Sequence, residues 1–272
     1  MMVILLDWRV RLILLIGIWM MTQRFSLASG HASAELWLSP PVVKQGSPTL
    51  IPAAIRMVYE KGWHGYWINP GEGGMKTEVT WKLPEGISVG EVLFPAPKRE
   101  MTGELACYGY TGEVLLPVLL TVSEKGQGAG QVEATVSWLA CNEKECAAGE
   151  AAIKVDLADA ATADPQRALA IRQAFEKLPQ TDARLTLDVK EADGWVELML
   201  KGADHLAWDG AQVFPVTEQA LDPSKPMVLQ KSSDGFKTRV KKNEYSTVAL
   251  TSLVLVVVPP QGANPIRIEW KK

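Results

Sequence analysis

The clearest feature of the sequence is a strict alternation of apolar and polar residues over positions 131–138, with the apolar residues at the even positions, which Ala140 continues. A period of two is typical of a β-strand that is buried on one face. If the same parity continues, Cys141 leaves the strand on the solvent side. The alternation resumes over positions 153–157, so the sequence predicts a β-hairpin whose connecting loop holds Cys141 and Cys146.

Shorter alternating or apolar runs predict further strands, separated by residues that favour turns. In the first half of the chain these runs cover 36–38, 50–59, 79–83 and 114–122. Together with the hairpin they indicate an antiparallel sandwich of immunoglobulin type. Residues 69–74 and 94–110 are rich in glycine and proline, so we expect irregular loops there, the longer of which covers a site.

The second half of the chain predicts another β-sandwich, smaller than the first, which makes the expected fold class all-β. Its strand candidates are 185–189, 195–200, 213–215, 227–230, 236–240, 248–258 and 266–270. Between the sandwiches, Asp164 and Pro165 suit a helix N-terminus, and Pro179 ends the apolar residues at helical spacing. We therefore expect a connecting helix of about fourteen residues. The predicted organisation is a signal segment at 1–34, a first domain at 35–157, a helical linker at 158–180 and a second domain at 181–272.

The N-terminal residues resemble a secretion signal. Arg9 and Arg11 precede an apolar run over 12–21, and small residues suited to cleavage follow at 26–28 and 32–34. A run of about ten residues is too short to span a bilayer comfortably, and an uncleaved anchor is the alternative. Either way, we expect the rest of the chain in an exported compartment, where disulfides persist.

Composition narrows the function further. The 272 residues are 47% hydrophobic and 22% charged, which is ordinary for a globular protein with a buried core. The net charge of −3 shows no basic excess and argues against nucleic-acid binding. The apolar run over 248–258 is β-branched and ends at two prolines, so we expect a buried strand there rather than a membrane span.

The cysteine loop indicates redox chemistry. Cys141 and Cys146 would close a loop so short that chain entropy gives a stabilisation of only about 2 kcal/mol. A short, exposed loop suits a disulfide that is made and broken. Two alternatives stay open: a plain structural disulfide, and a metal site in which the thiolates are joined by His64 and His205.

Four motifs occur in a fixed order and end at the first cysteine of this pair. They are Trp67-Ile-Asn-Pro-Gly, Trp81-Lys-Leu-Pro-Glu-Gly, Tyr108-Gly-Tyr-Thr-Gly-Glu-Val-Leu-Leu-Pro-Val118 and Trp138-Leu-Ala-Cys. Together they resemble the N-terminal domain of DsbD, and more closely its relatives in the ScsB group, which are described as disulfide-bond corrector domains. The resemblance covers residues 35–157. It implies an immunoglobulin-like periplasmic domain that takes electrons from a membrane partner and passes them to oxidised thiol proteins.

The resemblance assigns Cys141 and Cys146 to the family's redox pair. Cys107 departs from the pattern, because relatives usually have another residue before Tyr-Gly-Tyr. It makes the number of cysteines odd, which in an exported protein indicates a free thiol or an intermolecular bond. Two further interpretations are a small buried hydrophobic residue and a resolving thiol that pairs with Cys141 or Cys146.

The family also covers its cysteine pair with a cap loop that bears an apolar or aromatic residue. By resemblance, residues 99–103 are the counterpart, with Met101 as the shield and Tyr108 or Tyr110 behind it. The alternative for Met101 is an exposed loop methionine without a role at the site.

We therefore expect a protein-disulfide reductase or thiol–disulfide interchange component without a cofactor or a metal. It would relay reducing equivalents from a membrane-embedded thiol reductase of the DsbD, ScsB or CcdA type to oxidised periplasmic thioredoxin-fold or isomerase proteins. Glu143, Glu145 and Glu150 disfavour a nearby thiolate and Lys144 favours it, which predicts thiols that are not strongly activated. By analogy with the family, Cys146 attacks the target proteins.

Two other functions are consistent with the sequence. One is a non-catalytic binding module whose disulfide is structural, and the other is periplasmic copper handling with cysteine and methionine as soft ligands. In the second domain, His205 and Asp209 are close in sequence, and we interpret them as surface residues.

Overall fold

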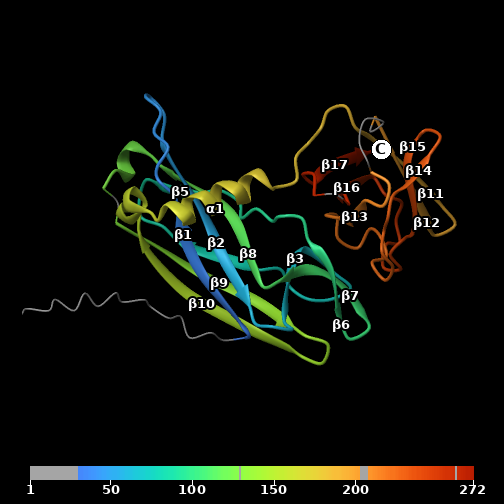
Figure 1. The fold of residues 1–272 in the computed structure, drawn as a ribbon, viewed down its shortest axis with the longest axis horizontal. Helices are drawn as coiled ribbons and strands as arrows, with labels where there is room; N and C mark the ends of the chain where they lie inside the picture. Colours follow the sequence, from blue (N-terminus) through green and yellow to red (C-terminus); the bar gives the residue numbers. More distant parts are fainter. Residues whose placement is uncertain (1–29, 129, 203–207, 261) are drawn as a thin grey trace, which may run out of the picture.

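The computed structural model describes residues 30–128, 130–202, 208–260 and 262–272. Most of the predicted signal segment, and His205, lie outside these residues. Antiparallel β-sheet dominates the described chain, and its strands gather in two bodies joined by a helical segment (Figure 1). No helix in the described ranges has the length and apolarity that crossing a membrane requires.

The first body is a sandwich of two antiparallel sheets, which confirms the predicted immunoglobulin-like fold. One sheet has the order β1-β2-β8-β5, formed by Ala32–Leu38, Thr49–Tyr59, Glu113–Val122 and Ile87–Val89. The other has the order β10-β9-β3-β7-β6, formed by Cys146–Asp156, Gln131–Cys141, His64–Gly71, Leu105–Thr111 and Lys98–Thr102, with β4 (Glu78–Lys82) also paired to β9. The even-numbered residues of β9, such as Val136 and Trp138, are buried between the sheets as the alternation predicts.

The helix α1 (Pro165–Glu176) begins where the sequence predicts it. Asp164 Oδ1 accepts hydrogen bonds from the N–H groups of Gln166 at 2.7 Å and Arg167 at 3.2 Å. This side chain satisfies helix N–H groups that have no partner within the helix. Two short 3-10 helices, η1 (Glu124–Gly126) and η2 (Leu157–Thr162), lie before it.

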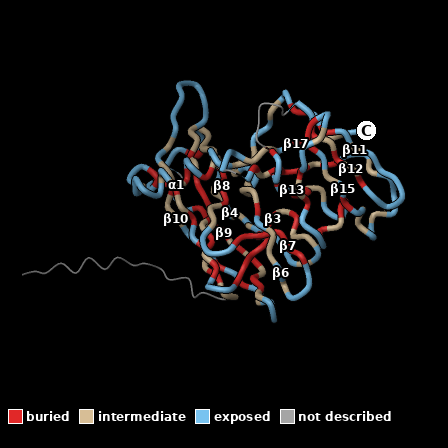
Figure 2. Tube along the Cα trace, turned by 45° about the vertical axis from the view of Figure 1, so that its right-hand side comes forward, coloured by how far each residue is buried: buried red, intermediate tan, exposed pale blue. Residues whose placement is uncertain are grey.

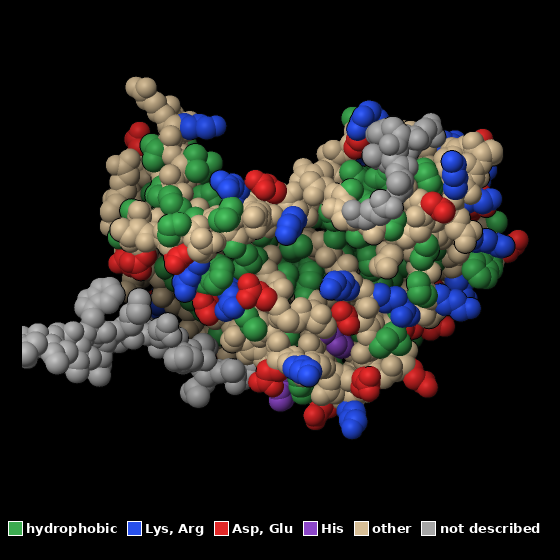
Figure 3. All heavy atoms as spheres, viewed as in Figure 1, with side chains coloured by type: hydrophobic (Ala, Val, Ile, Leu, Met, Phe, Trp, Pro, Cys, Tyr) green, Lys and Arg blue, Asp and Glu red, His purple; other side chains and the backbone are tan. Residues whose placement is uncertain are grey.

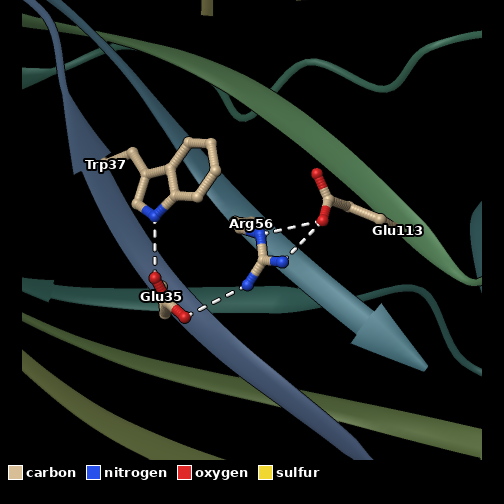
Figure 4. Close-up of polar contacts among 4 residues, drawn as sticks. All are labelled: Glu35, Trp37, Arg56 and Glu113. Atoms are coloured by element: carbon tan, nitrogen blue, oxygen red, sulfur yellow. Dashed lines mark hydrogen bonds and ion pairs between the residues drawn. The ribbon is translucent and has the colours of Figure 1, made fainter. Parts of the chain in front are cut away.

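Figure 4 shows a polar network of Glu35, Trp37, Arg56 and Glu113 on the β1-β2-β8 sheet. Arg56 donates hydrogen bonds to Glu113 at 2.6 and 3.0 Å and to Glu35 at 3.1 Å. Trp37 Nε1 donates to Glu35 at 2.7 Å, and Arg167 of α1 lies 4.9 Å from the centroid of a Trp37 ring. The helix therefore packs on the β1-β2-β8-β5 sheet, whereas the cysteines lie in the other sheet of the sandwich.

The second body has two antiparallel sheets, as expected for a second β-sandwich. One has the order β11-β12-β15-β14, formed by Thr186–Ala192, Trp195–Lys201, Gly235–Lys241 and Gln230–Ser232. The other has the order β13-β16-β17, formed by Gln212–Pro215, Ser252–Val258 and Ile266–Lys271. Leu198 and Leu200 from the first sheet and Leu253 and Leu255 from the second are buried in its core.

Three sequence predictions about regular structure are wrong. The strand expected at 227–230 is absent except for Gln230, where β14 begins. Most of residues 94–110, expected to form an irregular loop, lie in the β6–β7 hairpin, in which Met101 pairs with Ala106. Gly103 has a φ of +59° and provides the left-handed turn that the hairpin needs. The loop expected at 69–74 begins later than predicted, because β3 continues to Gly71.

The second sandwich contacts the β3–β7 region of the first. The Phe214 ring of β13 lies edge-on to Trp67, with centroids 6.4 Å apart, and to Tyr108, with centroids 5.3 Å apart. Asn69 Nδ2 donates to the Pro215 carbonyl at 2.8 Å. Figure 2 shows β3, β7 and β13 next to one another, and Figure 3 shows acidic and basic side chains interspersed over one face of both bodies.

We expect Phe214→Ala to lower the free energy of unfolding by about 3 kcal/mol, because it removes a buried aromatic ring that joins the two sandwiches. Urea denaturation followed by tryptophan fluorescence measures the change. Val248→Ala, at a side chain that is 74% exposed, is the matched control and should change stability by less than about 0.5 kcal/mol. Equal stabilities of the two variants would contradict this role for Phe214.

Candidate functional site

Cys141 and Cys146 form a disulfide at the end of the β9–β10 hairpin. Cys141 is the last residue of β9, Cys146 is the first of β10, and the two lie directly opposite each other with Cα atoms 4.0 Å apart. Asn142 holds the loop between them, because its Oδ1 accepts hydrogen bonds from the N–H groups of Lys144 at 2.7 Å and Glu145 at 3.0 Å. The loop thus has a defined conformation that keeps both cysteines in the sheet register.

The two cysteines of the disulfide differ sharply in exposure to solvent. Cys146 is exposed, whereas Cys141 is fully buried. The prediction that Cys141 faces solvent is therefore wrong. Its side chain does leave the alternating core pattern, but Tyr66 of β3 and Cys107 of β7 cover that second face of the sheet and form a small separate cluster with it.

The β6–β7 hairpin, which we call the cap hairpin (residues 98–111), lies against the cysteine loop. A Cβ atom built at Gly103, in its turn, would be 3.6 Å from the Glu143 carbonyl oxygen. The hairpin also approaches β3 closely, because a Cβ atom at Gly109 would lie 1.9 Å from the Gly65 carbonyl oxygen. Glycine is required at position 109 by this close approach to β3, and it suits position 103 because the turn there has a positive φ.

Thr102, next to the turn of the cap hairpin, joins three other side chains on this face. Its Oγ1 lies 3.1 Å from His64 Nε2, 3.3 Å from the Tyr66 hydroxyl oxygen and 3.6 Å from Cys107 Sγ. His64 is directly opposite Cys141 in the β3–β9 register. The tip of the cap is thus held by hydrogen bonds to residues that surround the buried cysteine.

Burial keeps these groups uncharged near neutral pH. Removal from water raises the pKa of the Cys107 thiol and raises the pKa of Tyr66 to about 12, although Thr102 opposes both shifts through its hydrogen bonds. The same loss of hydration lowers the pKa of His64. Cys141 therefore lies among groups that carry no charge at neutral pH.

The three residues predicted to shield the pair make their contacts elsewhere. Met101 is 39% exposed, and its sulfur accepts a hydrogen bond from Arg99 at 3.2 Å. Tyr108 is buried against Phe214, and the Tyr110 hydroxyl donates to the Pro95 carbonyl at 2.6 Å. Shielding by these side chains stays a prediction.

The sequence predictions did not place Tyr66 or Thr102 at the site, and they gave His64 only as a metal ligand. The available signal was the alternation of His64 and Tyr66, which places both side chains on one face of a strand. In the part of the chain that the structure describes, no group of three or more His, Cys, Asp or Glu residues is arranged to hold a metal ion.

Comparisons with known proteins agree with this architecture. The family model for the N-terminal region of the thiol:disulfide interchange protein DsbD matches residues 41–157. The solved structure of the N-terminal periplasmic domain of ScsB from Proteus mirabilis superposes with a TM-score of 0.63 and 15% identity, covering 89% of this chain and 98% of that one. At that identity the likeness shows a shared fold, which extends beyond the family match into the second sandwich. No curated protein matches the sequence.

We expect Cys107 in the folded, oxidised protein to react very slowly with a thiol reagent at neutral pH, because the thiol is buried and burial raises its pKa. Unfolding in denaturant should expose one reactive thiol per chain. The time course of reaction with an aromatic disulfide reagent measures both values. Cys107→Ala is the control and should show no reactive thiol after unfolding. Rapid labelling of the folded, unmodified protein would contradict the buried placement of Cys107.

Proposed function

Because residues 41–157 form a DsbD N-terminal-like domain, we propose that the protein is a periplasmic thiol–disulfide interchange component that works through Cys141 and Cys146. It accepts reducing equivalents from a membrane-embedded thiol reductase and passes them to oxidised thioredoxin-fold or isomerase proteins. The first domain (35–157) carries the chemistry, and the linker (158–180) connects it to the second domain (181–272). The N-terminal segment directs export.

The observation that carries this proposal is the asymmetry of the disulfide. A bond with a purely structural role gains little from one buried and one exposed sulfur-bearing residue. A bond that is exchanged with another protein needs one accessible sulfur for the partner and one protected sulfur for resolution. Cys146 is exposed and Cys141 is buried, which suits these two roles and agrees with Cys146 as the attacking residue.

The exchange follows from this arrangement. In the reduced protein, the Cys146 thiolate attacks one sulfur of the partner's disulfide, and the other partner sulfur leaves as a thiolate. Cys141 then attacks Cys146, which re-forms the internal bond and expels the partner's second thiolate. Two electrons have passed to the partner, and the membrane reductase restores the dithiol by the reverse sequence.

The cap hairpin lies over the buried Cys141 and not over the exposed Cys146, so its movement would control how far Cys141 is shielded during the exchange. Its far side rests on the second sandwich through Tyr108 and Arg99, whose Nη2 donates to the Ser224 carbonyl at 2.8 Å. At this contact the Tyr108 hydroxyl and Arg99 Nε are buried and make no hydrogen bond to another described residue.

The proposal predicts opposite behaviour for the two single-cysteine variants. Cys141→Ser leaves the exposed Cys146 thiol without its resolving partner, so it should accumulate mixed disulfides with oxidised periplasmic proteins. Cys146→Ser leaves only buried cysteines, so it should trap far less. Non-reducing electrophoresis of periplasmic extracts, followed by mass spectrometry of the reducible bands, measures the difference and identifies the partner.

Both variants are made in a Cys107→Ala background, so that the third thiol cannot contribute. Circular dichroism checks that each variant is folded. Equal trapping by both variants, or none by either, would contradict the proposed exchange.

A redox titration gives a second, independent test. A pair that relays electrons should equilibrate with glutathione or dithiothreitol at a potential above the roughly −300 mV below which structural disulfides typically lie. The fraction of oxidised protein is followed by alkylation of free thiols. A potential well below that value, with both cysteine variants unfolded, would indicate a structural bond.

A further inference from the structure

We infer that His64 is the proton-transfer partner of the buried Cys141, and that Thr102 is the residue that positions its ring. The inference rests on the proposed exchange and adds to it the group that manages the proton at the buried sulfur. It follows from the strand register, the hydrogen bonds of Thr102 and the burial of this face of the sheet.

The register places the imidazole next to the reacting sulfur. Cys141 has two cross-strand neighbours, Cys146 on β10 and His64 on β3. Residues directly opposite each other in antiparallel strands point to the same face, with Cβ atoms about 4.5–5.5 Å apart. The row Cys146–Cys141–His64 therefore aligns the accessible sulfur, the buried sulfur and a titratable ring across three neighbouring strands.

The chemistry requires a proton at this point. When a thiolate attacks Cys146, the internal bond breaks and its electron pair stays on the Cys141 sulfur. That sulfur is buried beside Tyr66 and Cys107, where an uncompensated charge is costly. A proton must therefore arrive as the bond breaks, and the same proton must leave when Cys141 attacks Cys146 in the reverse direction.

Among the titratable side chains of this cluster, His64 is best suited to carry that proton. Burial holds the pKa of Tyr66 at about 12 and raises the pKa of Cys107, so both keep their protons throughout the physiological range. An imidazole has its ordinary pKa near 6.5 and gains or loses a proton easily. In the reduction step the protonated ring gives its proton to the Cys141 thiolate, and solvent then reprotonates the ring.

Thr102 fixes the orientation of the ring. Thr102 Oγ1 lies 3.1 Å from Nε2 and 3.3 Å from the Tyr66 hydroxyl oxygen, so in the protonated ring Nε2–H donates to Thr102 Oγ1. This leaves Nδ1 as the nitrogen that exchanges its proton with Cys141. Because Thr102 belongs to the cap hairpin, the position of the cap and the orientation of the ring are linked.

The surroundings of His64 contain few charges that would compete with this role. Its own strand contributes Tyr66, whose ring centroid is 5.3 Å away, and β9 contributes Cys141. On β6, Glu100 shares the face of Thr102, and burial raises its pKa while nearby Lys98 opposes that shift. Other titratable groups around this face include Cys107 of β7, Cys146 of β10 and Glu72, whose carboxylate accepts a hydrogen bond from the Ala106 N–H.

The test is the pH dependence of disulfide reduction by dithiothreitol, with the rate expressed per thiolate of the reductant. In the unmodified protein this rate should rise as the pH falls through the pKa of His64, because the protonated ring supplies the proton. Burial lowers this pKa, so the inflection lies below 6.5. In His64→Gln the inflection should disappear, and the rate at low pH should fall about a hundredfold, as for loss of a positioned general acid.

Matched variants separate this role from a structural one. His31→Gln removes a histidine whose side chain is 42% exposed and paired with Glu60, and it should leave the pH profile unchanged. Thr102→Val should lose part of the low-pH rate, and Thr102→Ser, which keeps the hydroxyl, should restore it. A folded His64→Gln variant with the pH profile of the unmodified protein would overturn the inference.

A measurement on the unmodified protein covers the case in which His64→Gln fails to fold. The His64 ring signals in nuclear magnetic resonance spectra should titrate with different apparent pKa values before and after reduction of the disulfide. The difference arises because a free Cys141 sulfur exchanges a proton with the ring and a bonded one does not. Identical titrations in both states would overturn the inference.

These experiments use a small reductant, so they are independent of any protein partner. If single-cysteine trapping fails while the histidine inflection is present, the proposed exchange with proteins is wrong and the proton transfer stands. If trapping succeeds and the inflection is absent, the exchange stands and the role of His64 is wrong.

Discussion

The structure of the site depends on the antiparallel register of β9 with its two neighbours. One side of the register pairs Cys141 with Cys146, and the other pairs it with His64. Because side chains alternate between faces, a shift of one residue in either pairing would move Cys141 to the other side of the sheet from these partners. The Asn142 side chain fixes one pairing by holding the short loop, and the buried apolar residues of β9 fix the strand within the sandwich.

The cap hairpin covers the residues that this register brings together. It places Thr102 among His64, Tyr66 and Cys107, and it shields the face of the sheet that would otherwise expose Cys141. The protection comes from hydrogen-bonded polar side chains as much as from apolar ones. Such a contact holds the cap in place when every member has a partner, and it gives way without a large penalty once water can replace those partners.

Sequence patterns predicted the elements that are determined by residues close together in the chain. The alternation in β9 located the cysteine hairpin, and Asp164 with Pro165 located the start of α1. They failed where distant residues decide the outcome. The burial of Cys141 depends on Tyr66 and on the cap hairpin, whose strands were obscured by the prolines that precede them and by the glycine in their turn. The hydrogen bonds of Thr102 join residues that are far apart in sequence, and no local pattern reports such contacts.

The docking of Phe214 against Tyr108, together with the bond from Arg99 to the Ser224 carbonyl, ties the cap hairpin to a domain that has no cysteine. The hairpin is therefore not an independent flap, because lifting it also disturbs the far sandwich. In the proposed exchange, substitutions on that sandwich would therefore change how readily the buried Cys141 sulfur becomes accessible, with the cysteines themselves unchanged. The cysteine-free half of the chain would in this way regulate the half that holds the disulfide.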